Sequence, residues 1–137
     1  MIKFYAARLD SGADLREAIA DFAKANHITA GVVVSCVGHL TRLVVRLADA
    51  VPGHSPILDR KENFEIVSVT GTVEIHDMHL HISAADKSGN VVGGHLKPGC
   101  TIGITLELVI LAETALQFNR KPDPDNGFDC LVVKELS

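Results

Sequence analysis

The chain has 137 residues, of which 47% are hydrophobic and 22% are charged, and its formal net charge is −4 with histidine neutral. This composition is that of a folded globular protein and excludes a disordered chain. The negative balance disfavours a basic surface for non-specific contact with phosphate backbones, and the scarcity of aromatic residues disfavours base stacking on single strands.

The first part of the chain predicts a strand, a helix and a second strand. Residues 2–9 form the first strand, and residues 14–26 follow a helical period with their apolar side chains on one face. Asp14, with Glu17 three residues later, resembles the capping box of a helix N-terminus. Residues 30–37 are a continuous apolar run, which is typical of a strand covered on both sides.

The middle of the chain predicts two strands separated by a long loop. Gly38 is expected to break the preceding strand, and residues 41–48 form the next one. Residues 49–63 contain two prolines, a glycine and several charges, so we expect a loop there. Residues 64–75 alternate between the two faces of a further strand, which a turn would join to the next hairpin.

A hairpin with three histidines follows. Strands over residues 78–85 and 91–96 are joined by a five-residue polar loop that begins at Asp86. His79 and His81 share one face, because alternate residues of a strand point to the same side.

The pairing of these two strands decides where the third histidine lies. If Ala85 lies opposite Val91, then His81 lies opposite His95. A β-bulge at Gly93-Gly94 would shift the register by one residue and turn His95 to the other side.

Three imidazoles on one face, those of His79, His81 and His95, are a candidate metal site. Neutral imidazole suits Zn, Cu, Fe and Ni, and three imidazoles leave one position of a tetrahedral zinc ion open. The alternatives are polar side chains on a solvated face, hydrogen-bonding residues in an interface, or an interface that loosens when the histidines gain protons near pH 6.

The last part of the chain completes an α+β prediction. Residues 101–111 alternate as a strand that carries Glu107, and residues 115–120 and 128–135 form a last hairpin. The total is about eight strands and one main N-terminal helix. We therefore expect a single domain over residues 1–137 with a curled, largely antiparallel sheet.

The cysteines and the hydropathy pattern indicate the compartment. Cys36, Cys100 and Cys130 are widely spaced and form no CxxC pair, so buried thiols are expected before catalytic ones. The N-terminus lacks the apolar region of a signal peptide, and no apolar stretch reaches the ~18 residues that span a bilayer. These features predict a cytoplasmic protein that does not associate with a membrane.

Several motifs resemble the plant and prokaryote conserved (PPC) domain. They are the stretch from Asn63 to Gly71, then His79-Leu80-His81-Ile82-Ser83, and then Gly93-Gly94-His95-Leu96 with Gly99. The early Tyr5-Ala6-Ala7-Arg8-Leu9, the helix and Ser35-Cys36-Val37-Gly38 fit the same pattern. The resemblance covers nearly the whole chain, and the combination of motifs is specific.

The resemblance implies an α/β fold with an antiparallel sheet, a homotrimer and, in some members, a metal held by these histidines. The metal ligands would be His79, His81 and His95, and Gly93 and Gly94 would allow the close backbone approach that positions His95. The cofactor expected from this ligand set is a divalent metal, with zinc as the first choice.

The sequence departs from the family pattern at two positions. Asn63 stands where the plant motif has arginine, which puts in doubt a role of that arginine in subunit or partner contacts. His39 stands where a small serine is common, and it is either an additional ligand or a surface histidine.

The family resemblance also raises DNA as a partner. In plants the domain accompanies AT-hook DNA-binding motifs, and in bacteria and archaea it stands alone in proteins often described as DNA-binding. This chain has no Arg-Gly-Arg-Pro core of an AT-hook, and its 13 lysines and arginines are dispersed. The DNA association is therefore an analogy, because function does not follow from fold.

Two functions follow as hypotheses. The first is a stand-alone regulatory module, a homotrimer that acts through DNA or a DNA-binding protein. The alternative is a metal-dependent enzyme or a small-molecule-binding protein that uses the open position of the histidine site, with Glu107 or Asp86 as the general base. For both carboxylates a structural role is the competing interpretation, Asp86 as a turn residue and Glu107 as an exposed strand residue.

Overall fold

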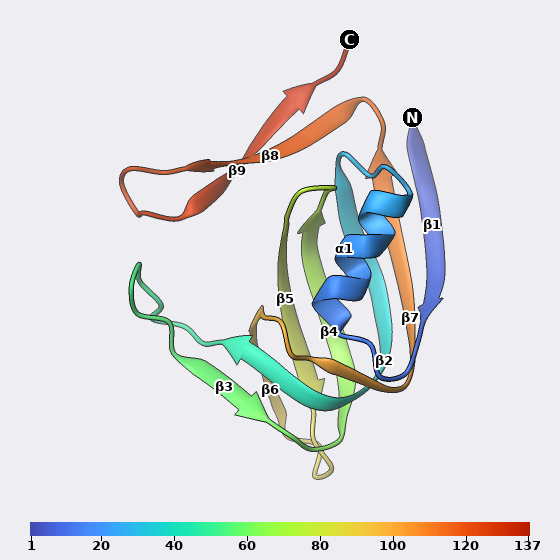
Figure 1. The fold of residues 1–137 in the computed structure, drawn as a ribbon, viewed down its shortest axis with the longest axis vertical. Coiled ribbons are helices and arrows are strands. Elements are labelled where there is room, and N and C mark those ends of the chain that lie inside the picture. The colour runs from blue at the N-terminus through green and yellow to red at the C-terminus, as the bar shows by residue number, and fades with distance from the viewer.

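One long, bent strand, β2 (Gly31–Arg46), organises the fold of the computed structural model, which describes residues 1–137 (Figure 1). Its N-terminal part pairs with β4 (Phe64–Val73) on one side and with β7 (Thr101–Glu113) on the other. Its last four residues pair with β3 (Ile57–Arg60), and its last two also pair with β6 (Val91–Leu96). Because β2 reaches the end strand of the sheet as well as the middle strands, the sheet curls on itself.

The main sheet is antiparallel and follows the order β1-β7-β2-β4-β5-β6. In this order β1 spans Ile2–Leu9 and β5 spans Met78–Ala85. β8 (Leu116–Pro122) and β9 (Asp129–Glu135) form a separate two-stranded sheet, a hairpin that projects away from the main sheet in Figure 1. The prediction of an α+β fold with a curled, largely antiparallel sheet is confirmed.

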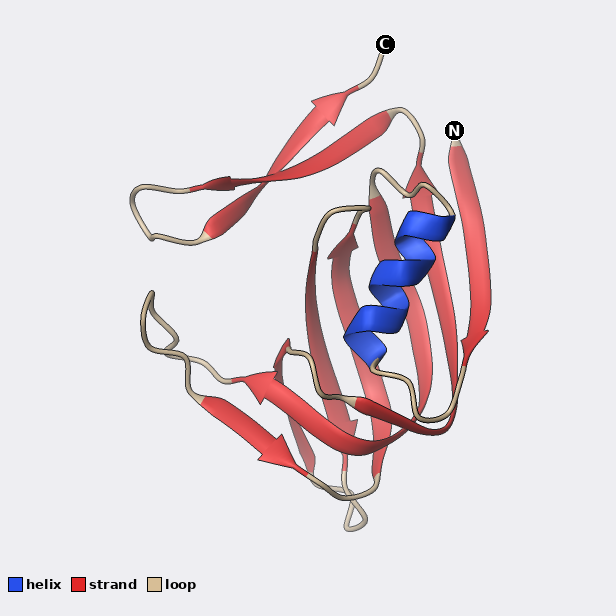
Figure 2. Ribbon diagram, in the orientation of Figure 1, coloured by secondary structure: helices blue, strands red, loops and turns tan.

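The single helix, α1 (Leu15–Ala25), lies against one face of the main sheet (Figure 2). The Asp14 side chain accepts a hydrogen bond from the backbone N–H of Glu17 at 3.0 Å, which satisfies a donor that the start of a helix leaves free and confirms the predicted cap. Leu15, Ile19 and Ala23 are buried in the hydrophobic core beneath the helix. No helix has the length and apolar character needed to cross a membrane.

The structure corrects two predictions about the strands. The break expected at Gly38 is absent, because irregularities in the β2–β7 register on both sides of Leu40 let β2 bend without ending. The loop expected over residues 49–63 contains β3, which pairs with the end of β2. With two expected strands merged into β2 and β3 added, the structure has nine strands.

The face of the main sheet opposite α1 carries exposed apolar side chains. Phe4 on β1 is 69% exposed, Val32 on β2 is 44% exposed and Val67 on β4 is 57% exposed. Thr72 lies opposite Val32 in the β2–β4 pair and opposite His79 in the β4–β5 pair. Directly opposed residues point to the same side of a sheet, so the apolar residues and His79 share this outer face.

Candidate metal centre and its pocket

The hairpin of β5 and β6 brings the three histidines together as the sequence predicts. Ala85 lies opposite Val91, and His81 lies opposite His95, without a bulge between them. His79 is two residues before His81 on the same strand, so all three imidazoles lie on one face. The ring centroids are 5.1 Å apart for His79 and His81, 5.2 Å for His79 and His95, and 5.8 Å for His81 and His95.

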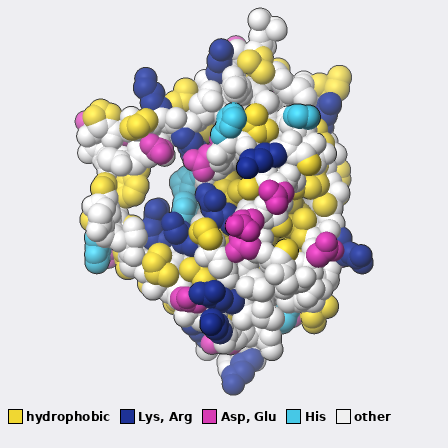
Figure 3. All heavy atoms as spheres, viewed as in Figure 1, with side chains coloured by type: hydrophobic (Ala, Val, Ile, Leu, Met, Phe, Trp, Pro, Cys, Tyr) yellow, Lys and Arg dark blue, Asp and Glu magenta, His cyan; other side chains and the backbone are white.

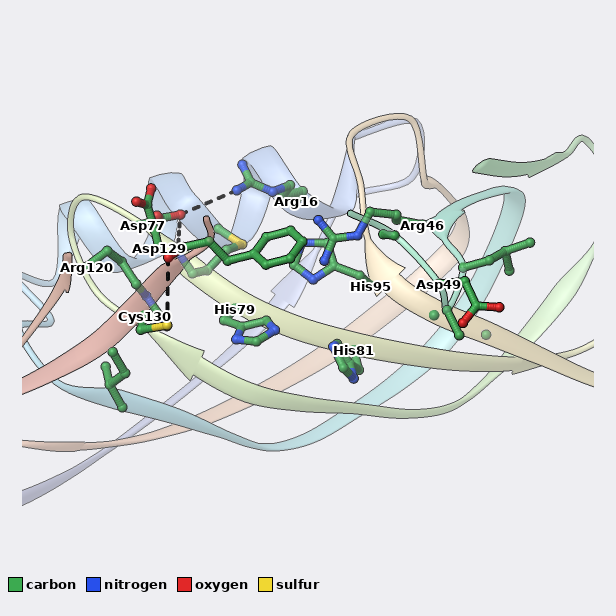
Figure 4. Close-up of a pocket in the computed structure, with 18 residues that line it drawn as sticks. Arg16, Arg46, Asp49, Asp77, His79, His81, His95, Arg120, Asp129 and Cys130 are labelled. Carbon is green, nitrogen blue, oxygen red and sulfur yellow. Dashed lines mark hydrogen bonds and ion pairs between the residues drawn. The ribbon is translucent and has the colours of Figure 1, made fainter. Parts of the chain in front are cut away.

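The donor atoms of the three rings can meet at one point. One ligand nitrogen of each histidine lies within 4.8 Å of those of the other two. His79 and His81 are exposed and His95 is partly buried, so the cluster is open to ligands from one side (Figure 4). The Nδ1 atom of His95 is buried and has no hydrogen-bond partner, and such an atom is costly unless something binds it.

Two glycines allow β6 to fit between its neighbours. A Cβ atom on Gly93 would collide with the backbone carbonyl oxygen of Ile82 on β5. A Cβ atom on Gly94 would collide with the backbone carbonyl oxygen of Arg46 on β2. Glycine at both positions therefore permits the close strand approach that places His95 over the site.

The surroundings keep the imidazoles of His79 and His95 in the form that binds metal. The pKa of His95 falls to about 4, first because of burial and then because of the positive charges of Arg46 and of the other two histidines. The pKa of His79 is also lowered, by burial first and then by His81, Arg120 and Arg46. Both rings are therefore neutral at pH 7, and a neutral imidazole is the species that ligates a metal ion.

This donor set fits a divalent metal ion. Three neutral imidazoles are the protein ligands of one well-known class of zinc centre, and no carboxylate or thiol joins them in the cluster. The unpartnered nitrogen of His95 is a further point in favour, because an ion at the cluster would complete the polar contacts of the site. His79, His81 and His95 are the residues that would hold the ion.

A pocket of about 910 Å³ opens over the histidines. One wall comes from β5, β6 and the end of β2, and the other comes from the β8–β9 hairpin and the loop after β2. Figure 3 shows it as a hollow with histidine and Lys or Arg side chains in its walls. Gly127, in the turn of the hairpin, packs close to Pro52 in the loop after β2, so these two segments meet at the rim.

The structure does not bring the other predicted residues to this pocket. Glu107 lies on β7 opposite Arg8 and Val37, is exposed, and does not line the pocket. Asp86 is the turn residue of the β5–β6 loop, where its carboxylate accepts hydrogen bonds from the backbone N–H groups of Ser88 and Asn90 at 2.9 and 3.0 Å. Neither carboxylate is placed to act as a general base at the histidines.

His39 also lies apart from the histidine cluster. It is on β2 opposite Glu65, its ring packs against Gly103, and it does not line the pocket. The reason is the bend of β2, which carries the middle of the strand away from the end that reaches β6. An additional ligand role for His39 at this centre is therefore wrong.

Sequence reasoning missed three side chains that line the pocket. Arg46 is at the end of β2, Arg120 is on β8, and Phe128 is in the turn between β8 and β9. In sequence all three are far from the histidines, and Arg46 is also far from the other two. The only local indication in the sequence was Phe128, an aromatic residue beside a turn that contains proline and glycine. Such a turn does not reveal which part of the molecule it covers.

Comparison with known proteins agrees with the fold and identifies the family. The family model of the Plants and Prokaryotes Conserved domain, abbreviated PCC or PPC, matches residues 1–114. The Bifunctional protein GlmU of two Synechococcus strains is 37% and 36% identical to this chain over 136 residues. These matches cover 99% of this chain and 21% of each relative, so the chain spans about a fifth of the length of the curated relatives it matches.

Solved structures share the architecture. A hypothetical protein from Salmonella has a TM-score of 0.91 and 36% identity, with 98% of this chain and 95% of that chain covered. A protein from Archaeoglobus fulgidus, described as metal-containing, has a TM-score of 0.83 and 26% identity, with 95% and 93% covered. A structure from Bacteroides thetaiotaomicron, described as a candidate DNA-binding protein, has a TM-score of 0.81 and 20% identity, with 94% and 91% covered.

Proposed function

This chain belongs to the Plants and Prokaryotes Conserved domain family, and we propose that it works as a metal-binding homotrimer whose functional centre is the histidine cluster. The observation that carries the proposal is the convergence of three imidazoles from one hairpin, with ligand nitrogens within 4.8 Å of one another. Zinc is the ion that this ligand set suits best. The 26% identical relative described as metal-containing supports a metal at this site.

The pocket gives the centre a function beyond structure. A structural zinc site is closed by four protein ligands, whereas a site with three leaves one position for a ligand from outside. A bound ion would supply Lewis acidity at that position. The histidines would hold the ion, and the hairpin of β8 and β9 forms the facing wall of the pocket, so the protein is proposed to bind a small molecule there.

The exposed outer face supports the trimer. Phe4, Val32 and Val67 present apolar surface to solvent in the single chain, which oligomers usually cover. His79 lies on the same face, on β5, opposite Thr72 of the neighbouring strand β4. In the proposed trimer the subunit interface therefore borders the metal centre, which links assembly to occupancy of the site.

DNA, or a DNA-binding protein, is the second candidate partner. The Bacteroides structure of the same fold is described as a candidate DNA-binding protein, and the net charge of −4 weighs against direct contact with phosphates. A gel shift at low salt that weakens steeply as salt is added would support direct binding. If the assembled protein gives no gel shift at low salt, direct DNA binding is rejected. The cytoplasm remains the predicted location.

Titration of the metal-stripped protein with zinc tests the proposal. We expect about one zinc ion per chain, and a large loss of zinc affinity in His81→Ala, since two imidazoles rarely hold zinc tightly. His27→Asn is the matched control, because His27 is exposed, does not line the pocket and has a φ of 52° that asparagine tolerates. Equal zinc binding by His81→Ala and the unmodified protein would reject the site.

A further inference from the structure

Two arginines at the pocket have no carboxylate partner. Arg46 lies opposite His95, and Arg120 reaches from β8 to Thr72, whose hydroxyl oxygen accepts a hydrogen bond from Arg120 Nη2 at 2.6 Å. Neither guanidinium forms an ion pair within 4.0 Å, and Nε of Arg120 is buried without a hydrogen-bond partner. The pocket therefore holds two positive charges with free donors.

Three other arginines of the chain form ion pairs with acidic neighbours. Arg42 is 2.7 Å from Asp59, and Arg60 is 2.7 Å from Glu62. The third arginine that lines the pocket, Arg16, is 3.6 Å from Asp77. This pairing leaves Arg46 and Arg120 as the guanidiniums of the pocket that are free to bind a ligand.

The pocket lining also includes Asp49 and Asp129, but neither forms an ion pair with Arg46 or Arg120, and these two unpaired guanidiniums beside the histidines favour an anion. Arg46 and Arg120 line the same pocket as the three histidines. A divalent ion on neutral histidines would add two positive charges to the same small volume. An oxyanion neutralises such a cluster, and the planar fork of a guanidinium matches the oxygens of a carboxylate or a phosphate.

The remaining lining suits the body of an organic molecule. The ring of Phe128 lies 5.6 Å from the guanidinium carbon of Arg46, and Met78 and Leu131 add further apolar surface. The volume of about 910 Å³ is within the range of roughly 300–1,000 Å³ typical of small-molecule sites. The pocket thus combines a charged end with an apolar wall.

We propose that this pocket binds a small organic oxyanion, a carboxylate or a phosphate ester, between the histidine centre and Arg46 and Arg120, with the apolar part of the ligand against Phe128 and Leu131. The inference rests on the proposed function for the metal, which supplies a third anchor for the anion. The contribution of the two arginines does not depend on the metal, because their unpaired hydrogen-bond donors belong to the chain itself.

Calorimetric titration of the zinc-loaded protein tests the ligand class. The probes are benzoate and phenyl phosphate, with inorganic phosphate as the anion without an apolar body and benzamide as the neutral isostere of benzoate. We expect benzoate or phenyl phosphate to bind at least tenfold more tightly than benzamide. Whichever of the two binds more tightly shows whether the site prefers a carboxylate or a phosphate ester. Failure of both to bind, or equal binding of benzamide, would overturn the proposal, and stronger binding of inorganic phosphate would overturn its apolar part.

Variants test the residues. Arg46→Gln and Arg120→Gln should each weaken binding of the preferred probe about tenfold or more, with unchanged circular dichroism and zinc content. Lys87→Gln removes an exposed positive charge in the β5–β6 loop and should leave the affinity unchanged. Unchanged affinity in both arginine variants, with the fold intact, would reject their role.

A spectroscopic experiment tests oxyanion binding separately from metal binding. Cobalt in place of zinc should show a visible spectrum that changes when the preferred probe is added. A stable cobalt spectrum that no probe alters, together with no calorimetric binding, would reject the oxyanion while the metal centre stands. If no metal binds, titration of the metal-free protein still tests the arginines, because binding should persist at reduced affinity and remain sensitive to Arg46→Gln.

Discussion

Arg46 lies directly opposite His95 where the end of β2 pairs with β6, so a guanidinium and an imidazole stand side by side on one face of the sheet. The pairing depends on Gly94, whose α-carbon faces the backbone carbonyl of Arg46. The bend of β2 therefore has a functional result. It carries a positive charge to a hairpin that is remote in sequence and places this charge beside the candidate metal ligands.

Replacing Gly94 with alanine should separate β6 from β2. Alanine in place of glycine ordinarily stabilises a chain slightly by restricting its unfolded state, but here the added Cβ meets a backbone oxygen. We expect a loss of about 1–3 kcal/mol in the free energy of unfolding, measured by urea denaturation, together with weaker zinc binding. Val91→Ala, at an exposed position of the same strand, should change neither property by a comparable amount. A Gly94→Ala protein as stable as the unmodified one would contradict the proposed strand contact.

The thiols should differ sharply in reactivity. Burial raises the pKa of the Cys36 thiol to about 12. Burial is also the main reason that the pKa of the Cys100 thiol is raised to about 11. Cys130 is only partly buried. Thiolate is the reactive species, so a disulfide reagent at pH 8 should modify one thiol per folded chain and three per unfolded chain. Rapid modification of Cys36 or Cys100 in the folded protein would show that these sites open readily.

The same thiols predict a loss of stability in alkali. Between the usual thiol pKa of 9.0 and the raised values, the unfolded chain loses its thiol protons while the folded chain keeps them. The folded state then binds more protons, so the free energy of unfolding decreases as the pH rises above 9. Urea denaturation at pH 8 and pH 10 measures the change, and Cys36→Ala should reduce it. An equal decrease in Cys36→Ala would assign the effect to other groups.

A charge on the outer face should prevent trimer formation. Val67 is 57% exposed on this face of β4, so Val67→Glu should leave the single chain folded while placing a charge in the proposed interface. Light scattering should report a trimer for the unmodified protein and a monomer for the variant. Val51→Glu is the control, because Val51 is 53% exposed in the loop after β2. A trimer that survives Val67→Glu, or an unmodified protein that is monomeric, would contradict the proposed interface.

The histidine hairpin was predictable because its geometry is local. The five-residue loop that starts at Asp86 and two regular strands fix the register, so the opposition of His81 and His95 followed from counting along the chain. The cap at Asp14 was predictable for the same reason, since its hydrogen bond to Glu17 spans three residues. Alternation, loop length and capping are all properties of neighbouring residues.

The pocket was not predictable because it depends on pairings between distant segments. The passage of β2 through Gly38 follows from irregular pairing with β7, and a glycine in sequence alone indicates a break as readily as a bend. Arg46 and Arg120 meet the histidines only after β2 curls to β6 and the last hairpin folds back. The distance of Glu107 from the histidines has the same origin, because strand order in the sheet separates β7 from β5.

Metal analysis is the most direct test of the central claim. The protein should be purified without added metal and analysed for all first-row transition metals, in parallel with His81→Ala and with His27→Asn as the control. We expect close to one ion per chain, most of it zinc, in the unmodified protein and the control, and a clear loss in His81→Ala. Equal metal content in the unmodified protein and His81→Ala would contradict a centre built from His79, His81 and His95.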